Sequence, residues 1–192
     1  STPIPTPTPI PLSWSRLYSG QAFPRDPVTA IVVNPSDPDV LYAGTQNAGV
    51  YKSLNGGISW QPAHYGLERA GIGSLIIDYN DPRTLYAGVI AGGVYKTTDG
   101  GESWRAINKG VGPLDFTSGI GNSIVLMDPQ DPRHLYYTSG PNIYESRDGG
   151  ESWSMVRQSA CPNDIWDLII HPKDPKTLFA TDEGHTCQGG IY

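Results

Sequence analysis

Four short apolar runs recur along the chain, and each is followed within a few residues by an Asp-Pro pair. The runs are residues 30–33, 75–77, 124–127 and 168–170. Their side chains do not alternate between apolar and polar, which favours β-strands covered on both faces over strands with one face in water. The pattern therefore predicts four buried inner strands.

The Asp-Pro pairs divide the chain into four units of similar length. Their aspartates are residues 37, 81, 131 and 174, so the spacings are 44, 50 and 43 residues. After each pair we expect a second strand, a glycine-bearing turn and a third strand. This is the period of a four-stranded propeller blade, and it predicts an all-β fold of the β-propeller type.

Three of the units end in a similar ten-residue segment. The copies read YKSLNGGISW at 51–60, YKTTDGGESW at 95–104 and YESRDGGESW at 144–153. An Asp-Gly pair between β-forming residues is a strong hairpin signal, because the turn needs a positive φ. The Asp carboxylate can also accept backbone N–H bonds across the turn. Each segment therefore predicts a hairpin that leads to an outer strand carrying the tryptophan.

These segments resemble the Asp-box, or BNR repeat, whose pattern is Ser/Thr-x-Asp-x-Gly-x-Ser/Thr-Trp. The second and third copies match it fully, whereas the first has Asn55 in place of Asp. The resemblance implies a β-propeller like those of sialidases, sortilin-type receptors, photosystem II assembly factors and family 74 xyloglucanases. It also implies that the boxes lie on the outer rim, away from an active face. The positions to which it gives a structural role are Ser53, Asn55, Gly57, Trp60, Thr97, Asp99, Gly101, Trp104, Ser146, Asp148, Gly150 and Trp153.

The predicted organisation is a Thr/Pro-rich extended linker at 1–11 and Asp-box propeller repeats at 12–192. The repeats fall into units at about 12–60, 61–104, 105–153 and 154–192. The fourth unit has no box, and residues 12–17 resemble an isolated outer strand. Either the repeats are part of a larger ring, which we favour, or the N-terminal strand closes a four-blade ring. Closure by a second copy of the chain is the third alternative.

Composition narrows the range of partners. The formal net charge is −6 and the basic residues are scattered singly, which argues against nucleic acid, because its binding needs a concentrated basic patch. No apolar run approaches the ~20 residues of a membrane helix. Thr/Pro linkers are typical of exported proteins, so we expect an extracellular or cell-surface location. No cofactor is indicated.

The two cysteines, Cys161 and Cys187, both fall in the fourth unit. In an exported chain an even and sparse cysteine count favours one disulfide, with free thiols as the alternative. His185 lies two residues before Cys187, but two cysteines and one histidine fall short of the four ligands of a structural zinc. We therefore predict no metal site.

Glycoside hydrolysis would need two carboxylates that face each other across the scissile bond. Asp115, in the long insertion at 111–119, and Asp182, after a strand of the fourth unit, are weak candidates that belong to no recognisable constellation. The xyloglucanase resemblance implies a catalytic carboxylate in a stretch that here reads TQNAG at 45–49, and Gln46 cannot act as an acid or base. The full set of carboxylates outside the repeated turns is Asp26, Glu68, Asp115, Asp164, Asp167, Asp182 and Glu183.

Aromatic side chains outside the boxes either pack between blades or form a surface for sugar or peptide. They are Tyr18, Phe23, Tyr65, Phe116, Tyr137 and Trp166. The sequence favours an exported, non-catalytic β-propeller that serves as a binding or assembly module at the cell surface. We expect a protein partner or self-assembly, because an incomplete ring leaves strand edges for another chain to cover. Carbohydrate is a further candidate ligand, and the alternative function is that of a fragment of a glycoside hydrolase resembling family 74 xyloglucanases.

Overall fold

The computed structural model of the chain describes residues 26–67, 70–112, 123–158 and 165–182. Within these ranges the regular structure consists entirely of β-strands, in agreement with the predicted all-β class. Cys161, Cys187, the linker at 1–11, and the strand expected at 12–17 lie outside the described residues. The disulfide therefore stays a prediction.

The strands form antiparallel sheets in which neighbours in the chain are also neighbours in the sheet. We call the sheets blades 1 to 4. Blade 1 contains β1 (Val28–Val33), β2 (Leu41–Thr45), β3 (Val50–Ser53) and β4 (Gln61–Pro62). Blade 2 contains β5 (Ile72–Ile77), β6 (Leu85–Val89), β7 (Gly93–Thr97) and β8 (Arg105–Ala106). Blade 3 contains β9 (Val125–Met127), β10 (Leu135–Ser139), β11 (Asn142–Ser146) and β12 (Ser154–Gln158), and blade 4 contains β13 (Ile165–Ile170) and β14 (Leu178–Asp182).

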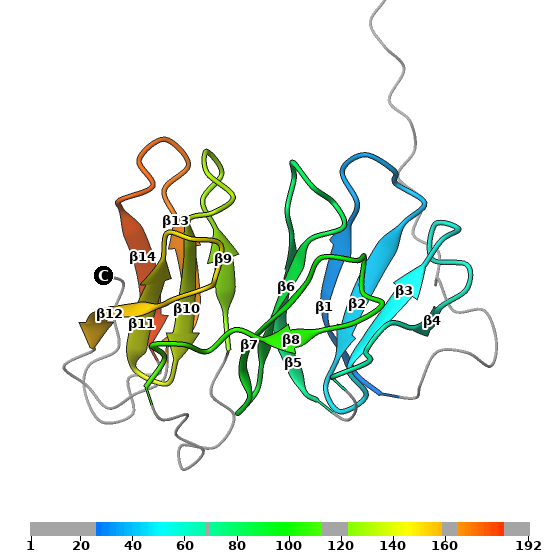
Figure 1. Cartoon of the computed structure of the whole chain (residues 1–192), viewed down its shortest axis with the longest axis horizontal. Helices are drawn as coiled ribbons and strands as arrows, with labels where there is room; N and C mark the ends of the chain where they lie inside the picture. The colour runs from blue at the N-terminus through cyan, green and yellow to red at the C-terminus, as the bar shows by residue number, and fades with distance from the viewer. Residues whose placement is uncertain (1–25, 68–69, 113–122, 159–164, 183–192) are drawn as a thin grey trace, which may run out of the picture.

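The blades stand side by side, with blade 1 at the right and blades 3 and 4 at the left of Figure 1. Their first strands contact one another in series, β1 with β5, β5 with β9, and β9 with β13, so these are the inner strands. We call the face of a blade toward the preceding blade its rear face, and the opposite one its forward face. The end of the sheets with the Asp-Pro turns and boxes is the box end, and the other is the distal end.

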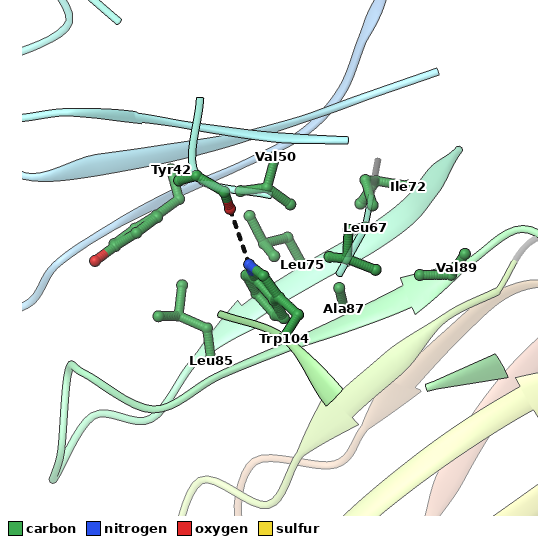
Figure 2. Close-up of a cluster of buried hydrophobic side chains, with 10 residues drawn as sticks. Tyr42, Val50, Leu67, Ile72, Leu75, Leu85, Ala87, Val89 and Trp104 are labelled. Atoms are coloured by element: carbon green, nitrogen blue, oxygen red, sulfur yellow. Dashed lines mark hydrogen bonds between the residues drawn. The ribbon is translucent and has the colours of Figure 1, made fainter. Parts of the chain in front are cut away.

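Apolar side chains fill the three junctions between consecutive blades. The first core joins Tyr42 and Val50 of blade 1 to Ile72 and Leu85 of blade 2 (Figure 2). A second core joins blades 2 and 3, and a third joins blades 3 and 4. Burial between sheets removes apolar area from water on both partners at once, so the stability of each blade depends on its neighbours.

Two expectations from the sequence are corrected. The outer strands begin one residue after the box tryptophan, at Gln61, Arg105 and Ser154, so the tryptophans precede these strands instead of belonging to them. The inner strands are also not all covered on both faces. In β1, Ile31 is 56% exposed, and in β13, Ile169 is 55% exposed. The physical reason is position, because among the described residues these two strands have a neighbouring blade on one side only.

Candidate functional site

The second and third boxes are closed by hydrogen bonds to one aspartate each. The Asp99 carboxylate accepts bonds from the Thr97 hydroxyl at 2.6 Å and from the Ser103 backbone N–H at 3.0 Å. Thr97 in turn accepts the N–H of Gly101 at 3.1 Å. Asp148 makes the same bonds with Ser146 and Ser152. The box aspartate and the hydroxyl two residues before it are thus paired within the hairpin itself.

The first box keeps this arrangement with a neutral side chain. Asn55 Oδ1 accepts the Ser53 hydroxyl at 3.1 Å and the Ser59 N–H at 2.9 Å, while its amide nitrogen donates to the Ser59 hydroxyl at 2.9 Å. Gly57 donates its N–H to Ser53 Oγ at 2.9 Å. The loop therefore needs a correctly placed acceptor oxygen and not a negative charge.

Hydrogen bonding lowers the pKa of both box aspartates. The Ser152 hydroxyl bond, opposed by burial, holds the pKa of Asp148 at about 2. For Asp99, burial raises the pKa, but hydrogen bonds from Ser103 and Thr97 together outweigh it and lower the value to about 2. A carboxyl group whose pKa is lower in the folded than in the unfolded protein stabilises the fold at pH values above its unfolded-state pKa. For Asp99 and Asp148 this stabilisation is complete above about pH 4 and is lost as the pH falls toward 2.

Stability in acid should therefore separate the wild type from the double variant Asp99→Asn, Asp148→Asn. We expect urea midpoints of the two proteins to be close at pH 2 and the wild type to be the more stable at pH 7, because only the ionised carboxylates carry the extra stability. Asp174 and Glu151 also have lowered pKa values, so the measured quantity is the difference between the two proteins. An equal difference at both pH values would contradict the assignment.

The tryptophans of boxes 2 and 3 dock on the preceding blade. Trp104 Nε1 donates to the Ala63 carbonyl at 2.8 Å, the bond drawn in Figure 2. Trp153 Nε1 donates to the Ile107 carbonyl at 2.7 Å. Both rings are buried. Next to Trp153, Gly110 has a φ of +92°, and a Cβ there would lie 2.0 Å from the Trp153 carbonyl oxygen, so only glycine fits.

On the forward faces of blades 1 and 2, a Tyr–Lys pair binds the box of the next blade. Tyr42 Oη and Lys52 Nζ both donate to the Gly100 carbonyl at 3.0 Å. Tyr86 and Lys96 donate in the same way to Gly149, at 3.2 and 2.9 Å. Each lysine also lies 5.3 Å from the centre of its tyrosine ring, a cation–π distance. We call this arrangement the Tyr–Lys latch.

Blade 3 replaces the latch with a buried charge cluster. Glu145 pairs with Tyr136 in the register in which lysines pair with tyrosines in blades 1 and 2. His134 Nδ1 lies 2.9 Å from the Asp128 carboxylate, and its Nε2 lies 2.8 Å from Glu145. Each nitrogen of the imidazole ring thus faces one carboxylate. Sequence reasoning missed this cluster, because nothing local links the three positions.

A groove of about 460 Å³ lies outside the blade 1–blade 2 junction, lined among others by Lys52, His64, Tyr65 and Glu102. At the next junction, Glu151, the equivalent of Glu102, forms ion pairs with Arg105 and Lys96. Gln61 occupies the register position of Arg105. Tyr65 is 73% exposed beside the groove. The lining residues include one carboxylate, that of Glu102, and so do not contain the carboxylate pair of a glycosidase.

The structure brings none of the sequence-predicted carboxylates together into a described pair. Asp115 lies outside the described residues, as do Glu68, Asp164 and Glu183. The backbone of Asp182 ends β14 opposite Ile165, at the distal end. Asp26, also at this end, accepts bonds from the Asn47 N–H at 2.6 Å and the Asn47 side chain at 2.9 Å. Although burial raises it, these bonds lower the pKa of Asp26, which makes it a poor proton donor.

The remaining predictions concern aromatic residues, metals and membranes. Tyr137 is buried in the second core, whereas Tyr65 and Trp166 are exposed. Tyr18, Phe23 and Phe116 lie outside the described residues. In the described ranges, no group of three or more potential metal ligands is found. The described residues also contain no helix long and apolar enough to cross a membrane.

Comparison with known proteins gives the fold. No family model matches the sequence, and no curated protein matches it. Solved structures do: an ancestral GH74 enzyme matches with a TM-score of 0.67 and 19% identity over 93% of this chain and 24% of its own. The extracellular domain of BT4673 from B. thetaiotaomicron matches with a TM-score of 0.66 and 16% identity over 91% of this chain and 22% of its own.

YCF48 bound to D1 peptide also matches, with a TM-score of 0.60 and 18% identity over 89% of this chain and 56% of its own. These proteins are β-propellers, which confirms the predicted fold class. The chain spans about a quarter of the length of the first matched structures. At these identities the likeness extends to the fold alone.

Proposed function

We propose that this chain is a non-catalytic β-propeller module of an exported protein, which binds or assembles with other molecules at the cell surface. The observation that carries the proposal concerns the carboxylates at the distal end of the blades. Its described carboxylates come from blades 1 and 4 only: Asp26 is held by Asn47, and Asp167 accepts the Leu168 N–H at 2.9 Å. Hydrolysis of a glycosidic bond needs an opposed acid and base or nucleophile.

Other features support a binding role. The groove beside Tyr65 is open, and the box residues form hydrogen bonds within their own loops. We propose that the boxes are structural and that Asp99 and Asp148 stabilise turns. One solved propeller of similar fold is bound to a peptide and another is an extracellular domain, which fits a protein partner and a cell-surface location. Carbohydrate binding by the exposed aromatic rings is a second candidate.

The proposal predicts no glycosidase activity. After incubation of the chain with xyloglucan, we expect no more new reducing ends than with a buffer control. A rise in reducing ends that Asp182→Asn or Asp26→Asn abolishes would contradict the proposal. It would favour the alternative, part of a glycoside hydrolase resembling the GH74 enzymes. Location is tested separately, by adding protease to intact cells of the natural source and following the loss of the protein.

A further inference from the structure

The junction between blades 1 and 2 and the junction between blades 2 and 3 are built from equivalent residues on their outer sides. In blade 1, Gln61 pairs with Lys52 in the register in which Arg105 pairs with Lys96 in blade 2. Two further pairs of equivalent positions are Glu102 and Glu151, and Ala63 and Ile107. A comparison of the two junctions therefore shows which contacts one of them makes and the other lacks.

At the second of these junctions a guanidinium group binds the glutamate. Arg105 Nη2 donates to Glu151, and Lys96 Nζ lies 3.7 Å from the same carboxylate oxygen. The hydrogen bond from Arg105 is the largest of the causes that lower the pKa of Glu151. The side chains of Arg105 and Glu151 are 55% and 53% exposed, so the pair forms at the surface of the protein.

At the first junction the glutamate has no such cation. Neutral Gln61 stands where the second junction has Arg105. Within the part of the chain that the structure describes, Glu102 forms no ion pair, and Lys52 donates to the Gly100 carbonyl at 3.0 Å. Because Glu102 is also exposed, its carboxylate is accessible to a cation from another molecule.

The groove beside Glu102 contains a small residue where the second junction has a larger one. Ile107 Cδ1 lies close to the box, since a Cβ on Gly150 would be 2.4 Å from it. At Gly101 the corresponding contact is with Ala63 Cβ, at 3.3 Å. The longer side chain that reaches the box at the second junction is thus missing at the first, which leaves room for a side chain from outside.

The other lining residues suit the side chain of arginine. The Tyr65 ring is 73% exposed and Leu54 is 58% exposed, and both line the groove. A guanidinium stacks on aromatic rings and forms paired hydrogen bonds with a carboxylate, while its aliphatic stem covers apolar surface. The formal net charge of −6 further favours the approach of a cationic partner.

We propose that the groove binds an arginine side chain of a protein partner, with the guanidinium on the Glu102 carboxylate. The inference rests on the proposed role as a binding module and adds the chemistry of its partner. Its argument is charge complementarity, because the partner supplies to Glu102 the group that Arg105 supplies within the chain. Lys52 does not exclude this second cation, since Lys96 and Arg105 both lie beside Glu151.

Titration of the whole chain with acetyl-arginine amide at millimolar concentrations, followed in amide NMR spectra, tests the proposal. We expect saturable shifts that centre on residues 61–65 and 100–102, which line the groove. Acetyl-citrulline amide has the same shape without the charge. It should bind about two- to fivefold more weakly, the net worth of an exposed ion pair.

Three variants locate the interaction. Glu102→Gln should weaken binding of the arginine probe by the same factor of about two to five. Gln61→Arg should weaken it at least as far, because the chain's own guanidinium then occupies Glu102 as Arg105 occupies Glu151. Glu151→Gln is the matched control. Its carboxylate already has a cation within the chain, so the affinity for the probe should stay unchanged.

Absence of saturable shifts at the groove would overturn the proposal, as would equal affinities for the arginine and citrulline probes or a Glu102→Gln variant that binds like the wild type. Groove shifts with a xyloglucan oligosaccharide but none with the arginine probe would instead assign the groove to carbohydrate. An unchanged spectrum far from each substitution shows that the variant folds. If a variant does not fold, the comparison of the two probes on the wild type still decides.

The proposed function and the arginine site can fail separately. New reducing ends from xyloglucan would contradict the non-catalytic role and leave the probe titrations unaffected. A groove that ignores the arginine probe would remove this partner chemistry and leave the hydrolysis result as it is.

Discussion

Replacing Trp153 with alanine is expected to lower the free energy of unfolding by about 3 to 5 kcal/mol, the range for removing a large buried aromatic side chain. The ring is 5% exposed and packs in the core between blades 2 and 3. Its loss would also leave the Ile107 carbonyl without the indole donor, and an unpaired buried carbonyl adds to the cost. Urea unfolding followed by circular dichroism measures the change.

Trp60→Ala is the matched control. Trp60 occupies the same box position, but it is half-buried and its indole N–H donates to Gly57 within its own box, at 3.0 Å. We expect its removal to cost about 1 kcal/mol, the typical effect of a point mutation. Equal costs at Trp60 and Trp153 would show that these tryptophans stabilise their own hairpins and not the junction between blades.

His134→Ala is expected to cost about 3 kcal/mol, because removing one partner of a buried ion cluster leaves uncompensated charges. The side chains of His134, Asp128 and Glu145 are only 7%, 4% and 15% exposed. Without the imidazole, both carboxylates lose a partner, and among the described ion pairs that of Glu145 with the exposed Arg147 remains. Urea unfolding at pH 7 gives the change in free energy.

The double variant His134→Thr, Glu145→Lys is the control for this cluster. It places the residue types of blade 2 at these two positions, where Thr84 bonds the turn aspartate and Lys96 stands in the place of Glu145. We expect it to recover most of the stability that His134→Ala loses, since no carboxylate is then left facing another. A cost below about 0.5 kcal/mol for His134→Ala, the size of an ordinary surface change, would mean that the cluster adds no net stability.

The sequence predicts local structure well where one short segment contains both the turn motif and the residues that hydrogen-bond to it. The Asp-Gly-Gly hairpins are such a case, since Asp99, Thr97 and Ser103 lie within seven residues and satisfy one another. The four-strand order of blades 1 to 3 also follows from local turns. The order of strands within these blades therefore depends on residues of each blade itself.

Features that depend on long-range contacts could not be predicted. Val32 and Ile31 are adjacent in an apolar run, but one packs on blade 2 and the other is exposed. Which of them is buried depends on the presence of a neighbouring blade, and the run itself does not specify this. Likewise, the Glu145 that replaces a latch lysine looks like an ordinary surface charge until the register places it beside His134.

The order of the junction contacts along the chain has a consequence for synthesis on the ribosome. Trp104 binds carbonyls of residues 63 and 65, and Trp153 binds those of residues 107 and 109. Every such acceptor has emerged before its tryptophan does, and domains begin to fold while synthesis continues. Each new blade can therefore pack on the blade that precedes it as soon as its own residues have been synthesised. Folding can thus proceed from the N-terminal blade onward while the later blades are still being made.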